Sequence, residues 1–466
     1  MKDSVRPENN QPLLRLLKLL HYAICIALFA YGWFRFRYHG NIINYAAIGF
    51  RYNYFVIIMY AVALLFFYRT YNAYMLGYNR IRSLLFSQIT SQVFTLAFTY
   101  VMVSVAWNRF DRPSALAGIL LVQVALDVVW TYIANKYYFK INSSKKAILI
   151  YRDEKDKRRF GNLGGKPSER LYKIQKELKY DGDFPELRDQ LEGYEAIFVA
   201  GVNSRCRNGI LKYCKETRTP GFFLPHVGDI IMQEAKHLQT FDSPILMVDR
   251  KYLDQEFVII KRAFDIISSA LGLIILSPVL LITAIAIKLN DRGPAIYKQT
   301  RLTKDGREFE ICKFRSMKVD AEKDGVARLS SGDNDDRITS VGRFIRKCRI
   351  DELPQLWNIL VGDMSVVGPR PERPEIAEQY YKVMPDFKLR LQVKAGLTGY
   401  AQIYGKYNTD PYEKLEFDLM YINDMSMLTD LRLMFATFKI LFSDESTEGV
   451  EKDQTSALHE SESTED

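Results

Sequence analysis

The sequence is poor in cysteine and has no pattern that would organise the thiols into a metal site or a disulfide framework. Its five cysteines are odd in number and scattered, with no CxxC pair and no Cys/His spacing of the zinc-binding kind. They are Cys25, Cys206, Cys214, Cys312 and Cys348. We therefore expect reduced thiols, on the cytosolic side of a membrane or buried within it.

Glycine-rich phosphate loops and nucleic-acid modules are also missing. No GxGxxG motif occurs, and Gly161, Gly164 and Gly165 come too late after the nearest expected strand to form a dinucleotide-binding turn. The formal charge of +9 admits nucleic acid, anionic lipid or phosphorylated ligands, but no recognisable nucleic-acid module accompanies it, so no nucleic-acid partner is expected. A cleavable signal peptide is not evident either, because the first apolar run is too long and others follow it.

What the sequence does contain is apolar segments. Hydrophobic residues make up 48% of the 466 residues and aromatic residues 13%, which excludes a largely disordered protein. Four apolar runs, each near the roughly 20 residues that cross a bilayer as a helix, fill the first third of the chain. They are 13–34, 45–67, 84–107 and 114–132. Tyr and Trp at their ends are typical of membrane interfaces.

Positive charge between these runs predicts their orientation. Eleven Lys and Arg flank the runs on one side and five on the other, which places both ends of a four-helix bundle in the cytoplasm. The eleven are Lys2, Arg6, Arg15, Lys18, Arg69, Arg80, Arg82, Lys136, Lys140, Lys145 and Lys146, and the five are Arg35, Arg37, Arg51, Arg109 and Arg112. Asp127, inside the fourth run, either faces the bundle interior or marks a transport pathway.

Short β-like runs alternate with polar, helix-forming segments from residue 145 to about 250. This pattern predicts a small Rossmann-like α/β domain with a parallel sheet. The expected strands are 147–151, 196–200, 221–224 and 245–248. Because the domain has no glycine-rich turn after a strand, a regulatory or structural role is favoured over dinucleotide binding.

A further apolar segment, Lys261–Arg292, combines three features. Its middle carries no charge and belongs in lipid, both of its flanks are basic, and Ser277 and Pro278 lie at its centre, where proline removes a helix hydrogen bond and kinks the chain. A re-entrant helix over about 262–290, broken at these two residues, accounts for all three features. An ordinary fifth spanning helix with a proline kink is the alternative.

The region that follows is basic and poor in aromatic residues. Residues 296–297 and 309–314 are expected to form a β-hairpin around Lys304, Asp305 and Gly306. Since four apolar runs precede it, lipid phosphates and headgroups suit this basic region better than nucleic acid does.

Charge is concentrated around an acidic pair, Asp351 and Glu352. Arg343, Arg346, Lys347 and Arg349 precede the pair, and Arg370 follows it. We expect a helix from Glu352 with Pro354 in its first turn, which puts Asp351 near the N-cap. There, backbone N–H groups and the helix dipole would keep the carboxylate ionised and able to act as a nucleophile. The plainer interpretation is a helix cap beside solvated charge.

The last part of the chain has three expected features. Lys394–Gly399 predicts a glycine-bounded turn, which either approaches a phosphate or sugar closely or is only a tight turn. Residues 412–421 and 428–442 are expected to be amphipathic helices, the second suited to a membrane surface. The acidic residues 443–466 predict a disordered tail.

Taken together, these residues resemble the bacterial polyprenyl-phosphate hexose-1-phosphate transferases, the monotopic phosphoglycosyl transferases that start exopolysaccharide, capsule and O-antigen repeat units. The motifs that carry the resemblance are, in order, KRAFD before the mid-helix Ser-Pro, KFRSM, DELPQLWNIL, GDMSVVGPRP, and KAGLTG followed by AQ. They cover about 261–442. The bundle and the α/β domain match the larger, multi-domain members more loosely.

The resemblance implies a domain order and a reaction. A four-helix transmembrane bundle (1–144) and the α/β domain (145–250) would precede a mostly α catalytic domain (251–442) with a re-entrant helix and a short β-hairpin, at the cytoplasmic face of the bacterial inner membrane. The enzyme would transfer hexose-1-phosphate from a UDP-sugar to undecaprenyl phosphate and release UMP. Asp351 would be the nucleophile and Glu352 would bind Mg²⁺. The residues implied to contact phosphate or substrate are Lys313, Arg315, Arg346, Arg349, Arg370, Gly396, Thr398 and Gln402.

The chain departs from the family pattern after Gln402, where it reads Ile403-Tyr404-Gly405-Lys406 and many relatives have Val-Asn-Gly-Arg. Exchanging Arg for Lys removes a bidentate fork that could contact sugar or nucleotide.

A non-catalytic membrane scaffold or regulator that binds nucleotide-sugars is the alternative function. The bundle offers surface for a homodimer, and the sequence does not name the sugar.

Overall fold

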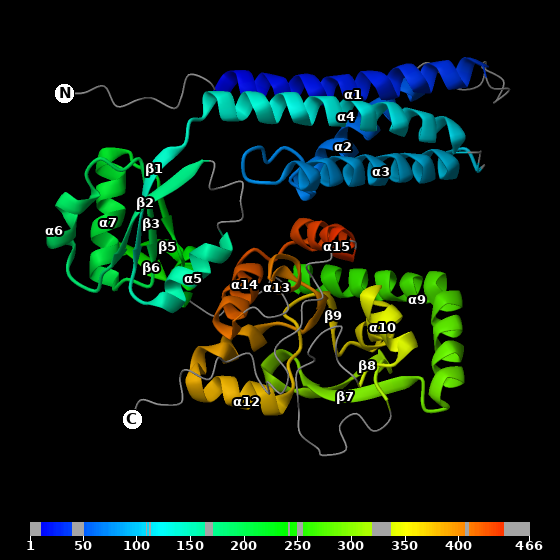
Figure 1. Cartoon of the computed structure of the whole chain (residues 1–466). Coiled ribbons are helices and arrows are strands. Elements are labelled where there is room, and N and C mark those ends of the chain that lie inside the picture. The colour runs from blue at the N-terminus through cyan, green and yellow to red at the C-terminus, as the bar shows by residue number, and fades with distance from the viewer. Residues whose placement is uncertain are drawn as a thin grey trace. The chain divides into compact units, whose positions relative to one another are not determined.

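The computed structural model describes residues 11–39, 51–108, 110, 113–163, 171–240, 243–248, 255–318, 337–405 and 410–441 (Figure 1). It divides into two compact units, Met1–Leu224 and Pro225–Asp466. The predicted acidic tail and Lys406 lie outside the described residues.

The first unit begins with four long helices that coincide with the predicted apolar runs, except that residues 45–50 of the second run lie outside the described residues. They are α1 (Gln11–His39), α2 (Arg51–Thr70), α3 (Ile81–Ala106) and α4 (Ser114–Ile141). By length and composition, five described helices could cross a membrane, namely these four and α9 (Gln255–Asp291). The predicted apolar helices are therefore confirmed, while the number that span a membrane stays a prediction.

Two helices of the bundle, α3 and α4, bury polar side chains and expose apolar ones. In α4 the buried positions recur every three or four residues and include Gln123, Asp127 and Thr131, whereas Leu121 is 72% exposed and Ile133 is 59% exposed. The buried side chains of α3 also include serines, threonines and glutamines. A helix in water turns its apolar face inward, so this inverted pattern indicates that the apolar face contacts lipid.

The rest of the first unit is a parallel α/β domain. Its strands are β1 (Lys145–Tyr151), β2 (Tyr172–Lys179), β3 (Ala196–Ala200) and β4 (Gly221–Phe223), in the order β2-β1-β3-β4. Its helices are α5 (Glu154–Leu163), α6 (Phe184–Leu187) and α7 (Ser204–Thr217), with a 3₁₀ turn at Arg188–Leu191. The parallel α/β fold is confirmed, and its strand order is that of flavodoxin-like sheets rather than the 3-2-1-4 order of the Rossmann fold.

Two strands differ from the sequence prediction. Strand β2 was not expected, because its sequence YKIQKELK is polar and most of its side chains are exposed or half-buried. The strand expected at 245–248 exists as β6 (Ser243–Met247), but its expected place in the parallel sheet is wrong, because β6 pairs antiparallel with β5 (Lys236–Thr240). Strand pairing depends on contacts outside the strand, which a local pattern does not contain.

The second unit begins earlier than the predicted boundary near residue 251. Helix α8 (Val227–Gln233) already belongs to it, and the buried side chains of Val227 and Ile230 are part of its core. The Asn423 side chain donates to the Ile230 carbonyl at 2.6 Å, and the Val227 N–H donates to the Tyr412 hydroxyl at 3.3 Å. These contacts fasten α8 to the C-terminal helices.

The predicted hairpin in the second unit is confirmed as β7 (Ile296–Leu302) and β8 (Glu308–Phe314), joined by a 3₁₀ turn at Lys304–Gly306. The elements that follow are α10 (Ser340–Lys347), α11 (Gln355–Val361), β9 (Ser365–Val367), α12 (Pro374–Val383), β10 (Gly396–Thr398), α13 (Tyr400–Tyr404), α14 (Pro411–Asn423) and α15 (Met427–Leu441). A 3₁₀ segment spans Pro385–Gln392. Helices α14 and α15 confirm the two amphipathic helices expected there.

Two local predictions in this unit are corrected. The helix expected from Glu352 begins only at Gln355, and a separate 3₁₀ turn, Ile350–Glu352, precedes it. The turn expected at Lys394–Gly399 contains a short strand, β10, which pairs in parallel with β9.

Helix α9 is 37 residues long, contains Pro278, and is bent into two limbs in Figure 1. The Ser277 hydroxyl donates to the Ile274 carbonyl at 2.7 Å, which satisfies one backbone acceptor just before the proline. Apolar side chains project from the helix, and Ile274 and Ile282 are 69% and 67% exposed.

Both limbs of α9 are attached to the second unit. On the first limb, the buried Asp265 carboxylate accepts hydrogen bonds from the Ser365 hydroxyl and the Val366 N–H, both at 3.0 Å. At the other end, Asp291 pairs with Arg315, and Ile287 packs in a cluster with Phe314 and Ile345. A straight helix of this length would extend about 55 Å, so the bend is what returns the second limb to the same domain.

Candidate active site

The buried Glu352 carboxylate is the centre of a cluster of basic side chains. Its Oε1 accepts from Arg370 at 2.7 Å and from Lys313 at 3.4 Å, and its Oε2 lies 3.9 Å from Arg349. Lys313 is at the end of β8, Arg349 precedes the 3₁₀ turn, and Arg370 follows β9. Cations from three segments of the chain thus meet at one carboxylate, and their predicted binding of phosphate stays a prediction.

The Asp351 side chain is half-buried and differs from Glu352 in having no ion pair or hydrogen bond to any residue that the structure describes. The predicted N-cap contacts are therefore not found, because Asp351 lies within the 3₁₀ turn and not at the start of α11. An acceptor without a partner beside a basic cluster is available to a ligand. Glu352, held by three cations, is not equally available.

The electrostatics separate the two carboxylates further. Burial acts to raise the pKa of Glu352, but Arg370, Lys313 and Arg349 outweigh it and hold that pKa well below its ordinary value. Burial, and then the neighbouring Glu352 charge, raise the pKa of Asp351 against the opposing effect of Lys313, Arg346 and Arg370. Asp351 is thus the more basic of the two carboxylates.

A sharp change of chain direction places the pair. Helix α10 begins with Thr339 at its N-cap, whose hydroxyl accepts from the Gly342 N–H at 2.9 Å, and it ends at Lys347. Arg349 then adopts the left-handed conformation with φ 52°, which costs roughly 1 kcal/mol for a residue with a Cβ. This residue turns the chain into the 3₁₀ turn that carries Asp351 and Glu352.

The loop that carries Arg370 is held by β9 and β10. The Gly396 N–H donates to the Pro369 carbonyl and the Gly368 N–H donates to the Thr398 carbonyl, both at 2.8 Å. A Cβ at Gly396 would lie 2.0 Å from the Gly368 nitrogen, so only glycine allows this approach. The structure therefore gives Gly396 and Thr398 a positioning role for Arg370, and their predicted contact with substrate stays untested.

Arg390 also holds the loop that carries Arg370, a role that the sequence analysis did not predict. Its guanidinium donates to the Arg370 carbonyl at 2.7 Å and pairs with the buried Asp418 at 2.7 Å and with Glu372 at 3.7 Å. Burial raises the pKa of Asp418 to about 6, against the lowering effect of Arg390. No local motif marks this network, because its members come from separate segments.

The remaining predicted site residues lie in different surroundings. Arg346, in α10, is close enough for its charge to lower the pKa of Asp351. Arg315 is buried against Asp291 at the end of α9 and links that helix to the hairpin. The Gln402 side chain, in α13, has both amide atoms buried without a hydrogen-bond partner among the described residues, and its predicted contact with substrate stays a prediction.

Several further positioning residues hold α11, which follows the acidic pair. Arg262, on α9, donates to the carbonyls of Ile359 and Leu360 at the end of α11, at 2.7 and 2.8 Å. Asn358 accepts from the Cys312 N–H at 2.9 Å and donates to the Glu310 carbonyl at 2.7 Å. Asn358 therefore joins α11 to β8, the strand that carries Lys313. The sequence could have indicated these roles, since Arg262 lies within the KRAFD motif and Asn358 within the DELPQLWNIL motif.

The donor set fits the predicted Mg²⁺ only when an anionic ligand is also present. Glu352 Oε2 lies 3.9 Å from Arg349, and an ionised carboxylate oxygen is a preferred Mg²⁺ ligand. The surrounding Lys and Arg charges would repel a bare dication, whereas a diphosphate would offset them. Mg²⁺ sites in proteins commonly combine one or two carboxylates with substrate phosphates.

Comparison with known proteins identifies a family for the second unit. Residues 256–444 match the family described as bacterial sugar transferase. An Escherichia coli K12 protein named UDP-glucose:undecaprenyl-phosphate glucose-1-phosphate transferase is 44% identical over 202 residues, which cover 42% of this chain and 41% of that protein. The exopolysaccharide production protein PSS of Rhizobium leguminosarum is 40% identical over 189 residues, covering 39% of this chain and 94% of that protein.

A third relative is matched over a longer segment. The UDP-N-acetylgalactosamine-undecaprenyl-phosphate N-acetylgalactosaminephosphotransferase of Aeromonas hydrophila is 39% identical over 271 residues, which cover 57% of this chain and 60% of that protein. The matched segments thus span about two fifths of the Escherichia coli protein and three fifths of the Aeromonas protein. The Rhizobium protein is matched over almost its whole length by 39% of this chain.

Proposed function

The chain belongs to the bacterial sugar transferase family, the polyprenyl-phosphate hexose-1-phosphate transferases, and from that membership we propose that it transfers a hexose-1-phosphate from a UDP-sugar to undecaprenyl phosphate. The observation that carries the proposal is the arrangement at residues 351 and 352. Asp351, a carboxylate with a raised pKa and no ion pair to a described residue, lies beside Glu352, a carboxylate that pairs with Lys313, Arg349 and Arg370. This arrangement suits a nucleophile next to a phosphate-binding cluster.

The reaction follows in two displacements at one phosphorus. An Asp351 carboxylate oxygen attacks the β-phosphorus of the UDP-sugar, the bond from that phosphorus to the bridging oxygen breaks, and UMP leaves with the bond electrons. The sugar-phosphate remains on Asp351 as an acyl phosphate. A phosphate oxygen of undecaprenyl phosphate then attacks the same phosphorus, and the Asp351 carboxylate is released with the product formed.

The basic residues supply what phosphoryl transfer needs most, which is positioning and neutralisation of oxygens. Lys313 and Arg370 lie closest to Glu352 and would contact the diphosphate from the same side as the acidic pair. Burial lowers the pKa of Lys313, and the Glu352 carboxylate opposes that shift. Mg²⁺ held by Glu352 would neutralise diphosphate oxygens as the charge shifts to the leaving group.

The soluble UDP-sugar and the lipid acceptor must both reach one site. Helix α9 indicates that this site lies at a membrane surface. Its exposed apolar side chains require lipid, and both of its limbs are attached to the same unit, so we infer a re-entrant helix and not a spanning one. Residues near its two ends would then lie on the cytoplasmic side, where UDP-sugars are available.

Cysteine accessibility tests this topology. Cys312→Ser and Cys348→Ser leave only the buried cysteines Cys25, Cys206 and Cys214. In that background, we expect a cysteine introduced by Glu256→Cys or by Lys298→Cys to react with a membrane-impermeant maleimide only in inside-out vesicles. Both positions are exposed, and they lie on either side of the apolar part of α9. Reaction of one site from each side of the membrane would establish a spanning helix instead.

The pH dependence of UMP release tests the role of Asp351. The attacking carboxylate must be ionised, and burial and Glu352 raise its pKa in the folded protein. We therefore expect the rate of the first turnover to increase with pH through a midpoint above about 4, the ordinary value for Asp. Glu352 is already ionised across this range and adds no second step.

The control for this experiment is protein that is exposed to the lowest pH, returned to neutral pH and assayed again, which separates protonation from denaturation. A rate that stays constant down to the ordinary pKa of an aspartate would contradict the assignment.

The proposed reaction is tested with the full chain in membranes, undecaprenyl phosphate and a panel of UDP-sugars. Because the relatives above are named for glucose and N-acetylgalactosamine, UDP-glucose and UDP-N-acetylgalactosamine are the first to compare. We expect one sugar to give both UMP and a lipid-linked sugar diphosphate. If no UDP-sugar of the panel gives Mg²⁺-dependent UMP release, a scaffold or regulator that only binds nucleotide-sugars becomes the better account.

A further inference from the structure

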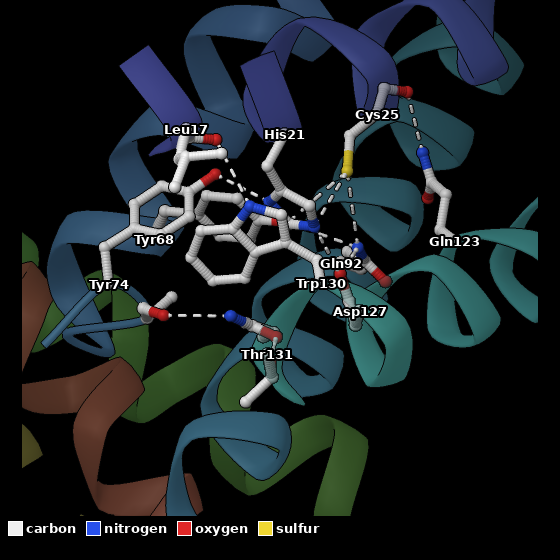
Figure 2. Close-up of polar contacts among 12 residues, drawn as sticks. Leu17, His21, Cys25, Tyr68, Tyr74, Gln92, Gln123, Asp127, Trp130 and Thr131 are labelled. Carbon is white, nitrogen blue, oxygen red and sulfur yellow. Dashed lines mark hydrogen bonds and ion pairs between the residues drawn. The ribbon is translucent and has the colours of Figure 1, made fainter. Parts of the chain in front are cut away.

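Three side chains of metal-binding type meet inside the helical bundle, far in sequence from the acidic pair of the second unit. His21 and Cys25 lie one turn apart on α1, and Asp127 projects from α4 (Figure 2). All three have an exposed fraction of 0%, and one ligand atom from each lies within 4.8 Å of the other two. Gln92, on α3, is also fully buried and reaches the same point.

We propose that His21, Cys25 and Asp127 bind one divalent metal ion of the zinc type, with the side-chain carbonyl of Gln92 as the fourth ligand. This proposal is independent of the reaction proposed above, since every ligand belongs to the bundle.

The distances within the cluster fit four ligands around one small ion. His21 Nε2 is 3.0 Å from Asp127 Oδ1 and 3.9 Å from Cys25 Sγ. The terminal amide nitrogen of Gln92 is 3.1 Å from the same carboxylate oxygen and 3.8 Å from the same sulfur. Ligand atoms around tetrahedral zinc, with bonds of about 2.0–2.3 Å, are roughly 3.3–3.8 Å apart. The three ligand atoms of His21, Cys25 and Asp127 all lie within 4.8 Å of one another, so shifts of up to about 1 Å and a half-turn of the Gln92 amide would complete the site.

Two buried acceptors at this site have no hydrogen-bond partner among the described residues. They are Asp127 Oδ2 and Gln92 Oε1. A buried acceptor without a donor costs roughly 1–3 kcal/mol, and inside a membrane no bulk water compensates for it. A bound cation would neutralise the Asp127 carboxylate and, once the Gln92 amide has turned, would take its side-chain oxygen as a ligand.

The orientation of His21 also suits a metal ligand. Its Nδ1 lies 2.9 Å from the Tyr74 hydroxyl, so an Nδ1–H can donate to that oxygen and leave the Nε2 lone pair directed at the cluster. The imidazole ring stacks on Trp130 with a centroid distance of 4.4 Å. These two neighbours fix the ring plane, as Figure 2 shows.

Charge and ligand type both favour a zinc-type ion. A thiolate, a carboxylate, a neutral imidazole and a neutral amide carry two negative charges in total, which a dication neutralises. Neutrality matters within a lipid bilayer, where an uncompensated charge is costly. Mixed nitrogen, sulfur and oxygen donors in a tetrahedral arrangement are typical of zinc, whereas Mg²⁺ and Ca²⁺ prefer oxygen ligands alone.

The alternative is that no metal binds here and that a proton lies between His21 and Asp127, which then form a buried hydrogen-bonded pair. That arrangement does not require Cys25, which would then be an ordinary apolar-type side chain of α1. A bound metal, by contrast, requires the thiolate and joins α1 to α3 and α4. The contribution of Cys25 therefore distinguishes the two accounts.

The test uses the full-length chain in lipid nanodiscs, treated with a chelator and then supplied with Zn²⁺ or Co²⁺ alone. After desalting, we expect about one zinc ion per chain to remain, as for a closed four-ligand site. We expect Co²⁺ to give a thiolate-to-cobalt charge-transfer absorption, which only a bound cysteine produces. Cys25→Ser should abolish that absorption, and both Cys25→Ser and Asp127→Asn should lose most of the retained zinc.

The matched control is Cys206→Ser, which removes a thiol of equal burial from α7, outside the bundle. It should retain zinc and the cobalt absorption at the wild-type level. The helical circular-dichroism signal and the thermal unfolding temperature in nanodiscs report whether the bundle of each variant is folded, since the proposed ligands all belong to the first unit. The proposal is overturned if wild-type protein retains no zinc and gives no thiolate-to-cobalt absorption, or if Cys25→Ser binds both metals as wild type does.

Discussion

Asp351→Asn is expected to reduce the steady-state rate of UMP release by roughly a thousandfold or more, the scale of loss when an enzyme loses its nucleophile. The amide has nearly the same shape as the carboxylate but lacks a nucleophilic oxygen that can form an acyl phosphate. Because the Asp351 side chain has no ion pair or hydrogen bond to a described residue, the substitution removes no observed contact. The thermal unfolding temperature should therefore remain close to that of the wild type.

Asp305→Asn is the matched control for this variant. Asp305 is exposed in the β-hairpin turn and has φ 58°, a conformation that asparagine tolerates as well as aspartate. Its UMP release should equal that of the wild type. If Asp351→Asn retained wild-type turnover in the same assay, Asp351 would not be the nucleophile.

Glu352→Gln is expected to combine a loss of activity with a loss of stability. The change leaves Lys313, Arg349 and Arg370 around a neutral amide, and removing one partner of a buried ion pair typically costs about 3–5 kcal/mol. It also weakens the proposed Mg²⁺ and phosphate positioning, so UMP release should fall by roughly a hundredfold. Thermal unfolding and UMP release at several Mg²⁺ concentrations measure the two effects separately.

The stability effect of Glu352→Gln should depend on pH. The folded-state pKa of Glu352 is held below its unfolded value, so its carboxylate stabilises the protein above about pH 4 and loses this contribution as the pH falls further. The difference in unfolding temperature between wild type and variant should therefore be largest near neutral pH and shrink in acid. Glu308→Gln, at an exposed position in β8, should show no such difference. A variant as stable as the wild type at neutral pH would contradict the role given to the cluster.

Elements whose signals are local could be predicted from the sequence. The hairpin around Lys304–Gly306 was found because turn residues separate two strand-like runs, and α14 and α15 because their apolar residues recur with helical spacing. The acidic pair and its cations were found through the same kind of short motif. Arg346, Arg349 and Arg370 indeed lie where their charges act on Asp351 or Glu352.

Features that depend on distant partners could not be predicted. Helix α11 starts three residues later than expected because Arg349 turns the chain into a 3₁₀ turn first. Arg390 acquires its role only where Asp418 and the Arg370 loop meet it. The same holds for His21 and Asp127, which are 106 residues apart in the chain and form one cluster only in the folded bundle.

Detection of the covalent intermediate tests the central claim most directly. The full chain is incubated with Mg²⁺ and a UDP-sugar labelled in the sugar, without undecaprenyl phosphate, and then analysed by intact mass and peptide mapping. The account predicts one sugar-phosphate per chain, in the peptide that contains Asp351, discharged when undecaprenyl phosphate is added and absent from Asp351→Asn. Release of UMP that requires the lipid, with no label on the protein, would show direct transfer between the substrates and contradict the account.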